Sequence, residues 1–268
     1  MSALTFTLKA TPQQRIDLSP LTPDQLTGKS PAEIGALSLV VGRKKLRVDS
    51  LFAISGDNID DLVFANSCDK LDYIGHDMKQ GRITVHGNAG DYLGLKLRSG
   101  EITVHGNAGI FAASGMAGGS LHIHGNAGDF LAAAIPGERK GMKGGTVIVT
   151  GNAGDRVGDQ MRRGLLLIEG NAGDYCASRM LAGTIGVLGQ VGAYAGYGMR
   201  RGTLLLTRTP ILHATIQDCG THTLPFLSLM FKSLAQLPSR FAQIDRNRVQ
   251  RYAGDLANDG RGEILVLL

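Results

Sequence analysis

Aliphatic residues recur through the middle of the chain at a spacing of nineteen residues. Each repeat unit opens with a glycine, and the second and fourth positions after it are aliphatic in every unit. This period of two over a short stretch predicts one β-strand per unit, with one buried face. The opening glycines are Gly81, Gly100, Gly119, Gly145, Gly164, Gly183 and Gly202, and the step from Gly119 to Gly145 alone is irregular, with seven extra residues.

A further column lies three residues before each opening glycine. It consists of Met78, Leu97, Met116, Met142, Met161, Met180 and Met199. Unbranched thioethers fill irregular gaps in cores, so we expect an interior ladder here and no metal or sulfur chemistry. The motif Gly-Asn-Ala-Gly follows the strands, at Gly87, Gly106, Gly125, Gly151 and Gly170. We interpret it as a turn in which glycine supplies positive φ and asparagine bonds to neighbouring backbone.

A nineteen-residue unit is too short for a helix pair, and it has no 3.6-residue pattern. We therefore predict an all-β fold, a single-stranded right-handed parallel β-helix whose coils hydrogen-bond to one another at about 4.8 Å. The 38 glycines and the aromatic content of 5% suit tight corners and small stacked side chains. A degenerate turn at 72–75 and a strand expected at 46–52 place the β-helix repeats at residues 45–208.

Both ends of such a solenoid expose unpaired backbone and need a cap. Residues 1–44 are the expected N-terminal cap, with a strand at 4–8 and a short helix beginning near residue 30. Residues 209–268 are the expected C-terminal cap, with a helix at 224–237 and a strand at 263–268. The outward strand positions of the later units are apolar, so we expect this helix or a partner subunit to cover them. These positions are Ile148, Leu165, Leu167, Leu188 and Leu205.

The formal charge of +5 and the pI near 9.2 favour acidic partners or anionic ligands. Nucleic acid is not an expected partner, because the chain lacks a Lys/Arg tract or basic helix with interleaved aromatics of the kind that such binders show. No apolar stretch is long enough for a membrane span, and no leader is recognised, so a cytoplasmic protein is expected. Cys68, Cys176 and Cys219 form no CxxC pair and are expected to be free thiols.

Two polar columns invite a metal-binding interpretation. The first holds His86, His105 and His124, with His122 nearby. A straight ladder does not converge on one zinc ion, so stacked surface imidazoles are favoured. The second holds Asp91, Asp129, Asp155 and Asp174. Calcium-binding β-rolls repeat every nine residues, so Asx-type turn bonding is favoured here.

A basic column lies two residues before the opening glycines. It holds Lys79, Arg98, Lys143, Arg162 and Arg200. Because it alternates with the buried methionine column, it points outward, as a solvated face or as a docking surface for an acidic partner or polyanionic ligand. The seven-residue expansion adds a basic loop with Arg139, Lys140 and Lys143, which is a candidate partner contact. No nucleophile–base pair, phosphate loop or metalloprotease motif occurs, so neither catalytic residues nor a metal or cofactor site is expected.

The run GDYLGLKLRSGEITVHGNAG at 90–109, with Gly-x-Met-Lys/Arg-x-Gly before the coils, resembles the C subunit of formylmethanofuran dehydrogenases. That subunit is related to the C-terminal β-helix domain of glutamate synthases. The resemblance covers nearly the whole chain, including Cys219-Gly-Thr-His and Arg251-Tyr-Ala-Gly-Asp. The family serves two complexes: a CO2-reducing one with a molybdenum or tungsten pterin subunit, in methane-forming archaea, and a formyltransferase/hydrolase complex in aerobic methylotrophic bacteria.

The second complex is favoured. It passes a formyl group from tetrahydromethanopterin to a methanofuran-type cofactor and hydrolyses it to formate. The resemblance implies that this chain is a non-catalytic structural subunit, with a metal-dependent, zinc-containing amidohydrolase-like subunit, a formyltransferase subunit and a further subunit as partners. The acidic glutamyl tail of the cofactor suggests a ligand for the basic column. Three alternatives stay open: the C subunit of a formylmethanofuran dehydrogenase, an inert fragment related to glutamate synthase, and a stand-alone metal-binding β-helix protein.

Overall fold

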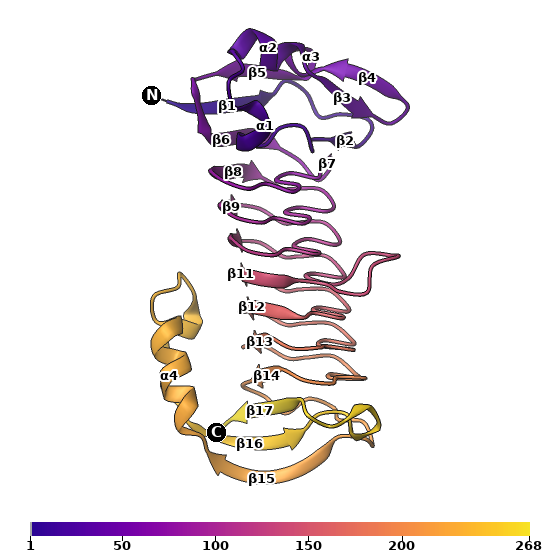
Figure 1. Cartoon of the computed structure of the whole chain (residues 1–268), viewed down its shortest axis with the longest axis vertical. Helices are drawn as coiled ribbons and strands as arrows, with labels where there is room; N and C mark the ends of the chain where they lie inside the picture. Colours follow the sequence, from indigo (N-terminus) through magenta and orange to yellow (C-terminus); the bar gives the residue numbers. More distant parts are fainter. Residues whose placement is uncertain (1) are drawn as a thin grey trace.

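A computed structural model describes residues 2–268, and the chain in it is mostly β with few helices. The central strands are mutually parallel: β6 (Asn58–Ser67), β8 (Arg82–Gly87), β9 (Glu101–Val104), β10 (Ser120–Ile123), β11 (Lys143–Val149), β12 (Arg163–Ile168), β13 (Thr184–Val187), β14 (Thr203–Leu206) and β17 (Glu263–Leu267). They are flanked by β1 (Ala3–Leu8) and β5 (Phe52–Ser55) at one end and by β15 (Gln217–Thr223) and β16 (Arg248–Ala253) at the other. The thirteen-stranded sheet thus has two edges, β5 and β15, at opposite ends of the molecule, and it does not close into a barrel (Figure 1).

Equivalent positions of successive units pair directly. Ile83 lies opposite Ile102, which lies opposite Leu121. Away from this sheet, the alanine of each Gly-Asn-Ala-Gly forms a second parallel ladder, from Ala89 to Ala108 and onward to Val191. Figure 1 shows the resulting stack of units between the two ends of the chain. The nineteen-residue period therefore sets the register of both ladders.

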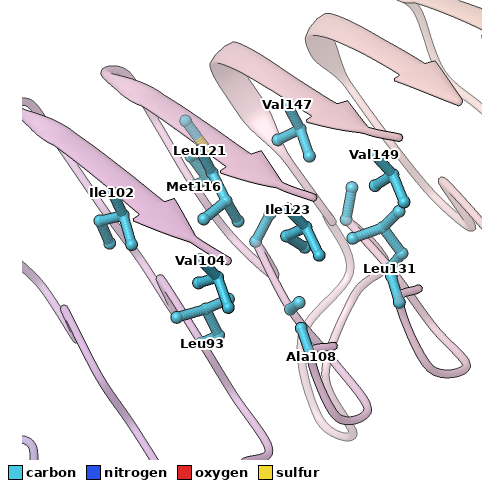
Figure 2. Close-up of a cluster of buried hydrophobic side chains, with 14 of the residues drawn as sticks. Leu93, Ile102, Val104, Ala108, Met116, Leu121, Ile123, Leu131, Val147 and Val149 are labelled. Atoms are coloured by element: carbon cyan, nitrogen blue, oxygen red, sulfur yellow. The ribbon is translucent and has the colours of Figure 1, made fainter. Parts of the chain in front are cut away.

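The interior of the stack is narrow and filled by the predicted columns. Figure 2 shows Met116, Leu121 and Ile123 pointing into it beside side chains of the neighbouring units. The seven residues of the methionine column, from Met78 to Met199, are all 0% exposed. The prediction of an interior ladder is confirmed. Dispersion contacts between equivalent side chains of neighbouring units help to hold the stack together.

The glycines of the motif Gly-Asn-Ala-Gly have a different role from the one expected. Positive φ occurs at the seven opening glycines, from 77° to 107°, but only at Gly87 among the first glycines of the motif. At Gly106 a Cβ would lie 2.5 Å from the carbonyl oxygen of Gly87, one unit earlier. The prediction of positive φ is therefore wrong for most of these turns, because glycine serves there to let two backbones approach.

The N-terminal residues form the end of the large sheet and a sheet of their own. β1 pairs with β6 in parallel and with β5 antiparallel, which confirms the strand expected at 4–8. The second sheet has the order β4 (Lys44–Arg47), β3 (Ser38–Val41), β2 (Ile16–Asp17), β7 (Leu71–Asp72). Two short helices precede β3, α1 (Pro23–Leu26) and α2 (Pro31–Ala36), and Ser30 and Glu33 form the capping box of α2.

The strand expected at 46–52 is wrong. The helical turn α3 (Val48–Leu51) interrupts it, and β4 pairs with β3 instead of with a repeat unit. Leu46 is 37% exposed whereas Val48 is buried, so the two-residue alternation that suggested a strand does not hold. A short apolar run is ambiguous from periodicity alone. The first repeat strand in the sequence is therefore β6, and β1 of the N-terminal residues pairs beside it in parallel.

The C-terminal residues cover one face of the later units. α4 (Pro225–Leu234) ends three residues before the expected end at 237. Its buried residues Leu227, Phe231 and Leu234 share an apolar cluster with the outward-facing Ile148, Leu167 and Leu205 of the repeats. After η1 (Arg240–Gln243), β16, and η2 (Leu256–Asn258), β17 extends the parallel sheet beside β14, so the strand expected at 263–268 is confirmed. β15 was not predicted, because its residues are nearly all polar and exposed and so lack the alternation of a half-buried strand.

Candidate functional site: a basic surface beside the repeats

All five residues of the basic column are exposed. Each directly follows a fully buried residue of the methionine column, so the backbone directs the charged side chain outward. Arg98 does not present a free charge, because its guanidinium donates two hydrogen bonds to Asp77, at 2.6 and 3.1 Å. Charge available to a partner is therefore unevenly spread along the column.

The inserted loop concentrates positive charge at one place. Together with Glu138, its Arg139 and Lys140 and the repeat residues Lys143, Arg162 and Arg163 line a surface cavity of about 580 Å³. Among the described residues, none of the five cations takes part in an ion pair. We call this site the basic cavity.

The one carboxylate of the basic cavity is already engaged. Glu138 accepts a hydrogen bond from Lys96 Nζ at 3.1 Å, and this bond is the main reason that the pKa of Glu138 lies below its ordinary value. The loop itself is tied to the repeats, since the Gly141 N–H donates to the Gln160 carbonyl at 2.9 Å. The arrangement presents several cations to one volume, which suits an anion with more than one acidic group.

The structure unites the loop with only part of the basic column. Lys143 and Arg162 line the basic cavity, whereas Lys79, Arg98 and Arg200 do not. Lys79 lies near the N-terminal cap, where its backbone N–H donates to Asp24 at 3.2 Å. The column, which Ala117 and Leu181 interrupt in the sequence, is thus not one site in space.

The histidine column is a stack of parallel rings. His86 and His105, and likewise His105 and His124, have ring centroids 5.0 Å apart with planes tilted by 6°. Burial, followed by the neighbouring imidazoles, lowers the pKa of His105 and of the half-buried His122 below its ordinary value. Within residues 2–268 no group of three or more His, Cys, Asp or Glu side chains has a geometry that could hold a metal ion.

The aspartate column bonds between units. The Oδ1 atom of Asp91 accepts a hydrogen bond from the N–H of Ile110, and Asp155 accepts one from Asp174, at 3.0 and 2.8 Å. Both bonds reach the equivalent position of the next unit, nineteen residues later. The prediction of Asx-type turn bonding is therefore wrong, because the Oδ1 atoms accept from the backbone N–H of the next unit in the stack. Asparagines of the motif bond in the same way, as Asn107 does with the N–H of Asn126.

The cysteines are free thiols, as expected. Cys176 is buried in the interior and Cys219 is exposed on β15. Burial raises the pKa of the Cys176 thiol to about 12. Within the same residues, no helix has the length and apolarity needed to cross a membrane.

A second basic surface was not predicted from the sequence. Arg43, Lys44, Lys45 and Arg47 lie within five residues, on the tip and the outer strand of the β3–β4 hairpin. The density of cations in this short run is the signal that reveals it. The run contains no aromatic residue, and Leu46 is its one apolar residue, so it differs from the pattern of a nucleic-acid binder.

The stacked parallel units and their charged outer surface define a class of repeat proteins that present binding groups on the outside of a packed core. Residues 60–217 match the GXGXG motif family. The chain is 50% identical over 262 residues to the C subunit of the formyltransferase/hydrolase complex Fhc of Methylorubrum extorquens, covering 98% of both chains. A chain of the crystal structure of the formyltransferase/hydrolase complex (FhcABCD) from Methylorubrum extorquens in complex with methylofuran superimposes with a TM-score of 0.91, with 40% identity and 98% of both chains covered. The protein therefore belongs to the family of the C subunits of formyltransferase/hydrolase complexes.

Proposed function

We propose that the chain is the non-catalytic structural subunit of a formyltransferase/hydrolase complex, which converts formyl-tetrahydromethanopterin to formate through a methanofuran-type cofactor. The observation that carries this proposal is 50% identity to the C subunit of Fhc over 98% of both chains. The packed interior supports a scaffold role, since the columns that line it are fully buried and leave the charged groups on the surface. Its proposed fold is a right-handed single-stranded β-helix between two caps. The repeats run from β6 to residue 208, the first cap comprises the residues before β6 and includes β4, α3 and β5, and the second cap comprises 209–268.

The partners in this proposal are the other subunits of a cytoplasmic complex. They comprise an amidohydrolase-like catalytic subunit that holds zinc, a formyltransferase subunit and a further subunit. The name FhcABCD of the related complex supports an assembly of four kinds of subunit. Neither nucleic acid nor a membrane is a partner.

Purification under native conditions tests the assignment. The full-length chain is tagged at its native chromosomal locus and bound to an affinity resin. Subunits with formyltransferase and formyl-hydrolase activity should be retained on the resin with it. A retained complex that instead reduces CO2 would identify a formylmethanofuran dehydrogenase. A chain that is recovered alone, with stoichiometric metal, would identify a stand-alone metal-binding protein.

The basic cavity is proposed to retain the acidic tail of the methanofuran-type cofactor. Five cations without carboxylate partners face one volume there, and several charge-assisted hydrogen bonds to carboxylates can form at once. In the assembled complex, the double variant Lys143→Glu and Arg162→Glu should raise KM for the cofactor, and added salt should reduce the difference from wild type.

A matched control lies in the same column. Arg200 is exposed like Arg162 but lies outside the basic cavity, so Arg200→Glu should leave KM unchanged. An equal rise of KM in the double variant and in Arg200→Glu would show that long-range charge, and not the basic cavity, causes the change. An unchanged KM in the double variant would reject binding of the tail, but it would not affect the proposal that the chain is a structural subunit.

A further inference from the structure

The β3–β4 hairpin ends in an unpaired strand. β4 is the outer strand of the four-stranded sheet, where it pairs only with β3, and its four residues are all exposed. Figure 1 shows the hairpin projecting sideways from the N-terminal end of the molecule. An edge of this kind offers a row of backbone N–H and C=O groups to another chain.

The same strand carries a dense positive charge. Arg43, Lys44, Lys45 and Arg47 supply four cations, against a net charge of +5 for the whole chain. Arg47 is paired with Asp49, whereas Arg43, Lys44 and Lys45 form no ion pair with any residue that the structure describes. Three uncompensated cations therefore lie next to an open strand edge.

A cavity adjoins the tip of the hairpin and extends its positive field. It measures about 770 Å³ and is lined by Arg15, Arg43, Lys44 and Lys70, with Asp69 and the neutral Gln13, Gln14 and Gly42. The ammonium of Lys70 donates to the carbonyls of Pro12 and Gln13, at 2.9 and 3.2 Å, so it keeps its charge near the opening. Arg15 is already paired with Asp72 and Asp91. Acidic groups beyond the end of the strand would therefore meet the Lys70 ammonium here.

Lysines on an edge strand also prevent unwanted pairing, and that role alone would explain a charged β4. It does not explain the apolar surface beside the charges: Val40 is 44% exposed and Leu46 is 37% exposed. The register pairs Val40 with Lys45 and Leu39 with Leu46, so each face of the hairpin carries an exposed cation beside an exposed apolar side chain: Lys45 with Val40, and Lys44 with Leu46. An edge of this kind matches an extended segment that has acidic and apolar residues on both of its faces. A phosphate ligand would use the cations alone.

We propose that the β3–β4 hairpin docks an acidic, extended segment of another protein chain by adding it as a strand to β4. Main-chain hydrogen bonds hold the segment against the edge. Arg43, Lys44 and Lys45 bind its carboxylates, and Leu46, which lies on the edge strand itself, contacts an apolar side chain of the segment. This surface is separate from the basic cavity and goes beyond the proposed function, so either can fail without the other.

The test uses the full-length chain and a fluorescein-labelled octapeptide in which Glu-Glu-Val-Val is repeated, so that both faces of the added strand carry Glu and Val. Binding is followed by fluorescence anisotropy. The triple reversal Arg43→Glu, Lys44→Glu and Lys45→Glu should weaken binding by about tenfold or more, because it removes three exposed ion pairs and places three like charges beside the peptide. The control Arg200→Glu and Arg201→Glu changes exposed cations that lie outside both the hairpin and the basic cavity, so it should leave the affinity for the octapeptide within about twofold. Bound octapeptide should also slow hydrogen exchange of the amides in 44–47.

Two further probes decide between strand addition and plain anion binding. An octapeptide with a central proline keeps most of the charge but cannot pair along β4, and it should bind more weakly. Inorganic tripolyphosphate should compete poorly and should give no amide protection. Equal binding of the proline peptide, or an equal loss in the control variant, would overturn the proposal. If the far-UV circular dichroism of the triple variant shows that it is misfolded, Lys45→Ala takes its place. In that variant, bound octapeptide should protect the amides of 44–47 less than it does in the wild type.

Discussion

Removal of the Phe231 ring should detach α4 from the stack and leave the stack itself intact. Phe231 is 3% exposed and lies in the apolar cluster that joins α4 to the outward faces of β11, β12 and β14. A buried Phe→Ala substitution costs about 3–5 kcal/mol. An isolated helix of ten residues is marginal in water, so the order of α4 depends on this cluster.

The loss should be local because the cluster under α4 is separate from the interior of the repeats. In Phe231→Ala, we expect amide hydrogen exchange in 225–234 to approach that of an open segment, while 102–104 and 166–168 keep their protection. Leu229→Ala is the matched control, because Leu229 is 70% exposed on the same helix and should change stability by no more than about 0.5 kcal/mol. Loss of protection throughout the repeats, or full protection of α4 in Phe231→Ala, would refute the reasoning.

Three more predictions concern the stack. Gly106→Ala should cost about 1–3 kcal/mol, measured as a lower urea midpoint, and an unchanged midpoint would contradict the close backbone approach. Iodoacetamide at pH 8 should label Cys219 and spare Cys176, whereas equal labelling would contradict the burial of Cys176. Because the pKa of His122 is lowered in the folded state, the unfolded chain binds a proton at a higher pH than the folded chain does. The free energy of unfolding should therefore fall as pH falls below about 6.5, and it should fall less steeply in His122→Gln. Equal slopes of this free energy against pH in the two proteins would exclude a contribution from His122.

The repeat period and the buried columns could be predicted from the sequence. They follow from the strict alternation of apolar and polar residues within each short strand and from the fixed spacing between units. Ile83, Ile102 and Leu121 are equivalent in sequence, and the stack places them opposite one another. The methionine column is interior because it recurs at a fixed offset from the strand. The outward direction of Lys143 and Arg162 followed from the same alternation.

Only the tertiary structure determined how the backbones of neighbouring units contact each other and how the terminal segments and the inserted loop pack against the units. The glycine of each Gly-Asn-Ala-Gly looks like a turn residue within one unit, and its true constraint is the backbone of the preceding unit. Gly186 interrupts the apolar outward positions without a sequence reason, and the structure supplies one, since a Cβ there would lie 2.7 Å from the ring of Phe241. The convergence of Arg139, Lys140 and Arg162 likewise depends on where the inserted loop folds back. A repeating sequence fixes the contacts that each unit makes in common, whereas contacts made by single segments far apart in the chain carry no period from which to predict them.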